Sequence, residues 1–122
     1  KSIRVVESFG TREYMSACPL FAAMRICARG RGKVAENTRK ESFHIIFIAS
    51  GEAVITAPDG AAVLEKGDTA LIPAGTGAYM LSGDFCAYRF WIPDFTEDYE
   101  KPLAFTGYSK EHIDALYKNI KG

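Results

Sequence analysis

Residues that commonly bind metal ions are scarce in this chain of 122 residues. It has only two histidines, His44 and His112, and three cysteines, Cys18, Cys27 and Cys86. The cysteines are odd in number and lack the spacing of a metal site, so we expect reduced thiols rather than a disulfide framework. Reduced thiols favour the cytoplasm as the location of the protein.

Long apolar runs are also missing. The run from Phe43 to Ser50 is less than half the length of a membrane span, so we expect no membrane segment. The opening stretch KSIRVVESFG has no apolar segment long enough for a signal peptide. Because the chain also begins without Met, we expect it to be part of a longer protein.

The formal net charge is zero, but basic residues gather in the first forty positions, with nine Lys/Arg against three Asp/Glu. Such an excess can mark a nucleic-acid partner. Aromatic side chains that could stack on bases are not interleaved with these residues, so we predict a solvated loop and no nucleic-acid partner. The basic residues expected on this loop are Arg29, Arg31, Lys33, Arg39 and Lys40.

What the sequence does contain is a series of short runs rich in Val, Ile, Phe and Tyr, separated by Gly, Pro, Asp and Asn. This pattern is typical of an antiparallel β-sandwich or barrel. The length predicts one globular domain. The expected strands are Ile3 to Glu7, Phe21 to Ala28, Phe43 to Ala49, Gly51 to Thr56, Ala61 to Leu64, Ala70 to Ile72, Gly77 to Ser82 and Cys86 to Ile92.

The last thirty residues differ in character from the strands. The stretch PDFTEDYEKPLAFTGY is acidic and aromatic, and we expect it to wrap the barrel because its aromatic residues need cover. A helix is predicted from Ser109, which is a suitable N-cap. We therefore expect a barrel over residues 1–93 and a connector with a helix packed on it over 94–122. The apolar stripe of this helix is Ile113, Leu116, Tyr117 and Ile120.

Turn residues in the centre of the chain follow a regular order. Gly51 separates two strands, a Pro-Asp-Gly turn follows at 58–60, and Gly67-Asp68 and Pro73-x-Gly75 flank the next short strand. This order resembles that of the cupin superfamily. The resemblance implies an all-β fold, the double-stranded β-helix or cupin jelly roll, here with a short C-terminal α-helix.

Metal-binding cupins usually have two histidines and a glutamate on the first of these strands and a third histidine after the Pro-x-Gly turn. Counting from the glycines of the motif places Thr38 and Lys40 at the first two histidine positions, His44 at the glutamate and Ala78 at the last. One imidazole does not hold a divalent ion with useful affinity. We therefore predict no metal ligands and no cofactor in this chain.

Strand alternation indicates which side chains face the barrel interior. It aims His44 and Ile46 inward, and the same argument on the later strand places Ala78 and Met80 inward and Tyr79 outward. These four inward residues are the predicted pocket lining. We expect His44 to be a structural histidine, hydrogen-bonded to a neighbour. No catalytic residue is predicted, because the sequence has no nucleophile elbow and no phosphate-binding glycine loop leading into a helix.

Three longer motifs carry a closer resemblance. CPLFAAMRI, SFHIIFIASGEAVI and LEKGDTALIPAG with YMLSG occur in this order between Cys18 and Gly83. The set resembles the C-terminal cupin domain of bacterial type I mannose-6-phosphate isomerases. The resemblance implies a parent enzyme that interconverts mannose 6-phosphate and fructose 6-phosphate, with zinc only in a preceding catalytic domain. It implies that this chain is noncatalytic, that its partner is that domain or a second copy, and that a small sugar or sugar phosphate is a possible ligand.

Two other functions stay open. Metal-free cupins similar to the N-terminal modules of AraC-type regulators share the glycine and proline order, which suggests a sugar-sensing domain. A metal-free sugar-nucleotide isomerase or epimerase would use His44 as a general base. For the second alternative, the sequence shows no obvious carboxylate partner for the histidine and no inward-facing tyrosine that could act as the general acid.

Overall fold

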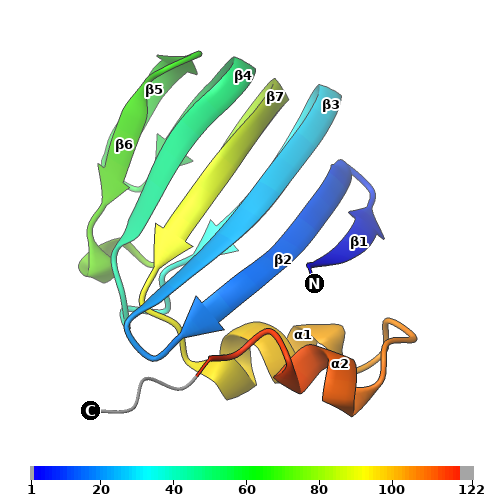
Figure 1. The fold of residues 1–122 in the computed structure, drawn as a ribbon. Coiled ribbons are helices and arrows are strands. Elements are labelled where there is room, and N and C mark those ends of the chain that lie inside the picture. Colours follow the sequence, from blue (N-terminus) through cyan, green and yellow to red (C-terminus); the bar gives the residue numbers. More distant parts are fainter. Residues whose placement is uncertain (1, 119–122) are drawn as a thin grey trace.

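The computed structural model describes residues 2–118 and contains one curved antiparallel sheet of seven strands within them (Figure 1). Its order is β1-β2-β3-β7-β4-β5, and β6 pairs with the first part of β4. The antiparallel all-β architecture predicted from the sequence is confirmed. The strands are β1 (Ile3–Glu7), β2 (Gly10–Cys18), β3 (Phe21–Asn37), β4 (His44–Ala57), β5 (Gly60–Glu65), β6 (Thr69–Ile72) and β7 (Ala78–Trp91).

The helical elements are short and lie at one end of the strands (Figure 1). A 3₁₀ turn (Ala74–Thr76) precedes β7, and a π-helical turn (Thr96–Glu100) leads into α1 (Lys101–Leu103) and α2 (Lys110–Asp114). Within residues 2–118 no helix has the length and apolar character needed to cross a membrane.

The predicted C-terminal helix is present but shorter than its apolar pattern suggests. The Ser109 side chain accepts a hydrogen bond from the backbone N–H of His112, which confirms the predicted N-cap. Ile113 and Leu116 are buried as expected, and Tyr117 forms an isolated bridge with β2 after α2 has ended. The remaining part of the prediction, which includes Ile120, lies outside the described residues.

The core lies on the concave face of the sheet. Odd-numbered residues of β7 face inward along its whole length, and they meet even-numbered residues of β3 and the first part of β4. Tyr99, Leu103 and Leu116 of the C-terminal segment are fully buried in the same apolar cluster. The Tyr99 hydroxyl also donates to the Met15 carbonyl of β2 at 2.9 Å, so this segment is fastened to the sheet. The division of the chain at residues 93 and 94 stays a prediction.

The structure confirms some of the predicted strands and corrects others. β1 has the predicted bounds, and the Pro58-Asp59 turn joins β4 to β5 as expected. β2 was missed, and β4 and β7 are continuous strands where two each were predicted. Gly51 lies at a bulge inside β4 rather than between strands, with φ of 76°. A Cβ there would lie 2.2 Å from the Asp84 carbonyl oxygen, so only glycine fits.

The prediction that all cysteines are reduced is wrong for two of the three. Cys27 of β3 and Cys86 of β7 are directly opposite in the sheet and form a disulfide, whereas Cys18 is a free cysteine. The two residues are separated by 59 positions in the sequence, and the pairing of β3 with β7 brings them together. Spacing along the chain therefore carried no signal for this bond.

Candidate functional site

The inner face of the sheet opens into a cavity of about 480 Å³. Strands β2, β3, β4 and β7 supply most of its wall, and the segment between β3 and β4 and the segment after β7 supply the rest. The polar and aromatic residues on which its chemistry depends are Arg12, Glu36, Thr38, Arg39, Glu41, His44, Arg89, Trp91 and Asp98.

Glu36 is the buried centre of an ion-pair network. It lies between two guanidinium groups: Arg12 binds its carboxylate at 2.6 Å, and Arg89 binds the other carboxylate oxygen. Arg12 also pairs with Glu7 at 2.9 Å. Burial alone would raise the pKa of the Glu36 carboxyl, but the charges of Arg89 and Arg12 outweigh it, so the pKa is lowered. Glu36 is therefore ionised and fully engaged.

Arg89 connects this network to the aromatic part of the wall. Its guanidinium lies 4.1 Å from the centre of the Trp91 ring, a cation–π contact. The Trp91 ring also stacks with that of Tyr99, with 6.2 Å between the ring centroids. Within the described residues, the Nε atom of Arg89 is buried without a hydrogen-bond partner. This nitrogen is therefore a donor that a ligand in the cavity could use.

His44 is buried beside Tyr79, with 2.6 Å between the ring Nδ1 and the tyrosine hydroxyl. Burial and the charge of Arg89 lower the pKa of His44 to about 4, so the imidazole is neutral near pH 7. Burial raises the pKa of Tyr79, which keeps its hydroxyl protonated. Within residues 2–118 that hydroxyl has no other partner, so donation from it to Nδ1 satisfies both atoms and leaves the ring proton on Nε2.

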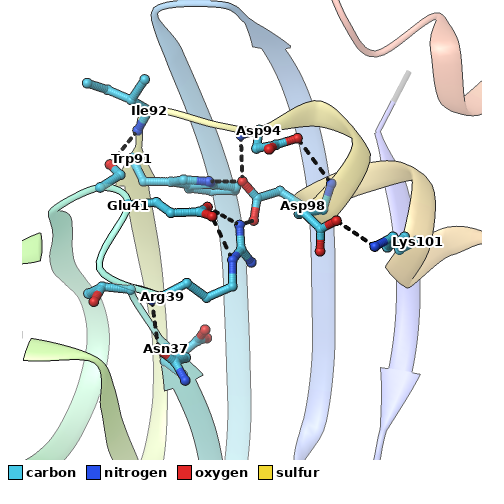
Figure 2. Close-up of polar contacts among 12 residues, drawn as sticks. Asn37, Arg39, Glu41, Trp91, Ile92, Asp94, Asp98 and Lys101 are labelled. Atoms are coloured by element: carbon cyan, nitrogen blue, oxygen red, sulfur yellow. Dashed lines mark hydrogen bonds and ion pairs between the residues drawn. The ribbon is translucent and has the colours of Figure 1, made fainter.

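A second ion-pair network, centred on Arg39 and Asp98, also lines the cavity (Figure 2). Asp98, from the π-helical turn, accepts from Arg39 at 2.8 Å and from the indole N–H of Trp91 at 2.9 Å. The same Arg39 nitrogen pairs with Glu41 at 3.0 Å. Arg39 has a positive φ of 52°, which turns the chain between β3 and β4 toward Asp98. The connector is therefore attached to the segment between β3 and β4 by an ion pair, in addition to its packing on the sheet.

The positions where other cupins carry metal ligands do not fit a divalent ion. The Thr38 hydroxyl donates to the Ala74 carbonyl at 2.6 Å and accepts from the backbone N–H of Gly77 at 2.9 Å, so it serves the turn before β7. Lys40 is exposed and Ala78 has no donor atom. Only His44 could coordinate, and no group of three or more His, Cys, Asp or Glu side chains with metal-binding placement occurs in residues 2–118.

The structure separates the four predicted pocket residues. His44 lines the cavity, and Ala78 lies at its wall on the opposite side of β7 from the core. Ile46 is fully buried in the apolar core and does not reach the cavity. The prediction for Met80 is wrong, since its side chain is 38% exposed and Tyr79 faces inward instead. The buried Tyr79 ring lies beside His44, which satisfies the tyrosine hydroxyl.

The charged centre of the site was missed from the sequence. Glu36 and Arg89 occupy inward positions of β3 and β7, and Arg12 lies on β2, which was not recognised as a strand. A signal did exist for Arg89, because it alternates with the aromatic residues of Tyr88-Arg89-Phe90 at an inward register. Charged side chains are rarely buried unless paired, and a pair between distant strands leaves no local pattern.

A curved antiparallel sheet around a cavity of this kind defines the cupin class of protein. The family model described as the mannose-6-phosphate isomerase cupin domain matches residues 21–89, which is more than half of the chain. The chain therefore belongs to the mannose-6-phosphate isomerase cupin-domain family, as the sequence motifs suggested. No curated protein sequence matches it significantly.

Solved structures agree with this fold. KdgF from Halomonas sp. superposes with a TM-score of 0.65 at 13% identity, covering 77% of this chain and 86% of KdgF. Mannose 6-phosphate isomerase from Bacillus subtilis gives 0.62 at 18% identity, covering 74% of this chain but only 28% of the isomerase chain. An RmlC-like cupin from Shewanella frigidimarina gives 0.62 at 14% identity over 76% and 86%. At these identities the likeness establishes the fold alone.

Proposed function

We propose that this chain is a noncatalytic cupin domain of a mannose-6-phosphate isomerase or of a protein related to one. In this proposal the interconversion of mannose 6-phosphate and fructose 6-phosphate takes place in another domain, which also holds the zinc. Membership of the family supports the proposal, as does the match to part of the Bacillus subtilis isomerase.

The observation that carries the proposal is how the cavity side chains are used. Glu36 is bound by two arginines, Thr38 serves a turn, and His44 is bound to Tyr79. A general base needs an accessible lone pair and a pKa near the working pH. The pKa of His44 is about 4, and Tyr79 donates to its Nδ1, so His44 offers the cavity an N–H donor rather than a base. This arrangement disfavours His44 as the base of an isomerase or epimerase.

The test is an isomerase assay on this chain with mannose 6-phosphate and excess zinc, coupled to detection of fructose 6-phosphate. We expect no turnover above a blank without protein. Turnover that is lost in His44→Gln would overturn the noncatalytic proposal. Turnover that survives in His44→Gln and stays in constant proportion to the chain through a further purification step would also overturn it, whereas turnover that is lost on purification belongs to a contaminating isomerase.

A specific observation favours a second candidate, a sugar-sensing domain that binds an uncharged sugar. Every arginine in the cavity wall is paired: Arg12 and Arg89 with Glu36, and Arg39 with Asp98. The wall has three arginines against four carboxylates, so it offers no unpaired cation for a phosphate group. The unused donor at Arg89 Nε and the Nε2–H that the Tyr79 hydrogen bond leaves on His44 suit a hydroxyl oxygen instead.

Calorimetric titration with mannose and with mannose 6-phosphate tests this second candidate. Binding of the free sugar that is weakened in His44→Gln would support it. Absence of any binding of free sugars, or binding of the phosphate ester alone that is weakened in His44→Gln, would contradict it. The noncatalytic proposal does not depend on this result.

We further propose that the partner is an isomerase domain, which would cover the convex face of the sheet. Phe21, Phe47 and Leu71 are partly exposed there, and Phe21 stacks on Phe90 at 5.6 Å. Exposed apolar patches of this kind mark contact surfaces. The proposal is supported by the Bacillus subtilis isomerase, of which 72% lies outside the match because the match covers 28%. Analytical ultracentrifugation should show a monomer, whereas a dimer dissociated by Phe90→Lys would indicate a second copy instead.

A cytoplasmic location is part of the proposal. The Cys27–Cys86 disulfide removes the argument from reduced thiols, so the proposal rests on the proposed substrate alone. Phosphorylated sugars are ionised and do not cross a bilayer unaided, so a protein connected with them is expected where they are made. Fractionation of cells that produce the protein at its natural level should place it with a cytoplasmic marker enzyme. Recovery with a secreted or membrane marker would contradict this location.

A further inference from the structure

A second recess, of about 460 Å³, lies apart from the cavity and shares no lining residue with it. It forms where β3 and β4 each carry a bulge, between Ala28 and Gly32 and between Ile48 and Ser50. Bulges bend strands away from regular pairing and are frequent beside functional sites. The backbones approach so closely here that a Cβ on Gly10 would lie 2.0 Å from the Cys27 carbonyl oxygen. The recess is thus built from closely packed backbone.

Three arginines line this recess: Arg4 of β1, and Arg25 and Arg29 of β3. The single carboxylate in its wall is that of Asp84, which accepts a hydrogen bond from the backbone N–H of Gly30 at 3.1 Å. Within residues 2–118 no ion pair involves any of the three arginines. The recess therefore has a positive excess, in contrast to the cavity, where each arginine is paired.

One acidic neighbour reduces this excess without removing it. Glu13 of β2 lies between Arg4 and Arg25 in the sheet register. Its carboxylate accepts a hydrogen bond from the Ser2 hydroxyl and forms no ion pair with either arginine in the described part of the chain. The hydroxyl groups of Thr11 and Ser50 also line the recess and add neutral donors.

Guanidinium groups that converge on a half-enclosed, polar recess recognise anions with several oxygens. Each planar fork matches two phosphate oxygens, and like charges gathered without partners are stabilised when a counter-ion lies between them. A carboxylate offers fewer oxygens and less charge than a phosphate monoester. The number of unpaired arginines and the size of the recess thus suit a small phosphorylated molecule better than a simple carboxylate.

We propose that this recess binds the phosphate group of a small phosphate monoester, with Arg25 as the central anchor and Arg4 and Arg29 on either side. Arg25 is half-buried, whereas Arg4 and Arg29 are exposed, so Arg25 is the least solvated residue of the three. The predicted solvated loop is wrong for Arg29, Arg31 and Lys33, which lie on β3, and part of the basic excess of the first forty residues lines this recess. The site is distinct from the cavity of the proposed function and does not depend on it.

Titration calorimetry at low ionic strength tests the site, with inorganic phosphate and mannose 6-phosphate as separate probes. We expect one site for each probe and weaker binding as salt is added, because the contacts are ionic. Arg25→Gln should weaken binding of both probes by about tenfold or more, which is typical for loss of one charge-assisted contact. Arg31→Gln is the matched control, since Arg31 is exposed on the same strand and does not line the recess.

The outcomes separate a specific site from general charge attraction. Weaker binding in Arg25→Gln with unchanged binding in Arg31→Gln supports the proposal. No binding of either probe to the unaltered protein, or equal weakening by both substitutions, overturns it. His44→Gln should leave phosphate binding unchanged. If that substitution abolishes binding while Arg25→Gln does not, the phosphate lies in the cavity and this proposal is wrong.

Discussion

Replacing Glu36 by glutamine would leave two buried guanidinium groups without a counter-charge. The side chains of Glu36, Arg89 and Arg12 are only 4%, 9% and 12% exposed, so water cannot compensate for the lost carboxylate. Removing one partner of a buried ion pair typically costs about 3–5 kcal/mol. We expect Glu36→Gln to lower the free energy of unfolding by this amount, which is a large part of the stability of an ordinary domain.

Urea denaturation followed by circular dichroism measures this loss. Glu41→Gln is the matched control, because Glu41 pairs with Arg39 but its side chain is 51% exposed. Exposed pairs contribute at most about 1 kcal/mol, so the control should remain close to the unaltered protein. A loss in Glu36→Gln no larger than that in Glu41→Gln would refute the buried network as a source of stability.

The same carboxylate gives a defined response to acid. Burial raises the pKa of Glu36, yet the charges of Arg89 and Arg12 dominate and lower it below its usual value of 4.5. A lowered folded-state pKa means that the stabilisation is present above the unfolded-state pKa and is lost as the pH falls through the folded-state value. The unaltered protein should therefore lose this contribution below about pH 4.5, and Glu36→Gln should lack it.

Three further predictions concern other parts of the molecule. The pKa of His44 is lowered from 6.5 to about 4, so as the pH falls the unfolded chain binds the proton first. The free energy of unfolding should therefore decrease as the pH falls from 6.5 to 4, by up to about 1.4 kcal/mol per pH unit. Urea titrations should find this dependence missing in His44→Gln. Tyr99→Ala should cost about 3–5 kcal/mol in the same assay, because Tyr99 is fully buried, and a loss below about 1 kcal/mol would show that the connector is not docked as described. Thiol titration of the denatured, unreduced protein should find Cys18 alone reactive, whereas three reactive thiols would contradict the disulfide.

The fold could be predicted from local features of the sequence. The Pro58-Asp59 turn and the β1 alternation are encoded by neighbouring residues, and both are present in the structure. β2 was missed because its inward residue Arg12 is charged, and its partner Glu36 lies 24 positions further along the chain. Gly51 was interpreted as a strand boundary, since a bulge and a turn require the same backbone freedom.

The candidate site was less predictable than the fold. Counting from motif glycines placed His44 and Ala78 in the cavity wall, where both lie. Strand alternation then assigned Met80 to the interior in place of Tyr79, because it did not reveal that Tyr79 could bind His44. The Glu36 network and the disulfide both join strands that are distant in the sequence. Such pairings depend on the sheet register, which the local pattern does not contain.

The claim on which this account depends is that the cupin positions Thr38, Lys40, His44 and Ala78 do not form a metal site. Calorimetric titration of the purified protein with zinc, under conditions that keep Cys18 blocked, measures this most directly. We predict no stoichiometric binding and no difference between the unaltered protein and His44→Gln. Tight binding of one zinc ion per chain that disappears in His44→Gln would contradict the account.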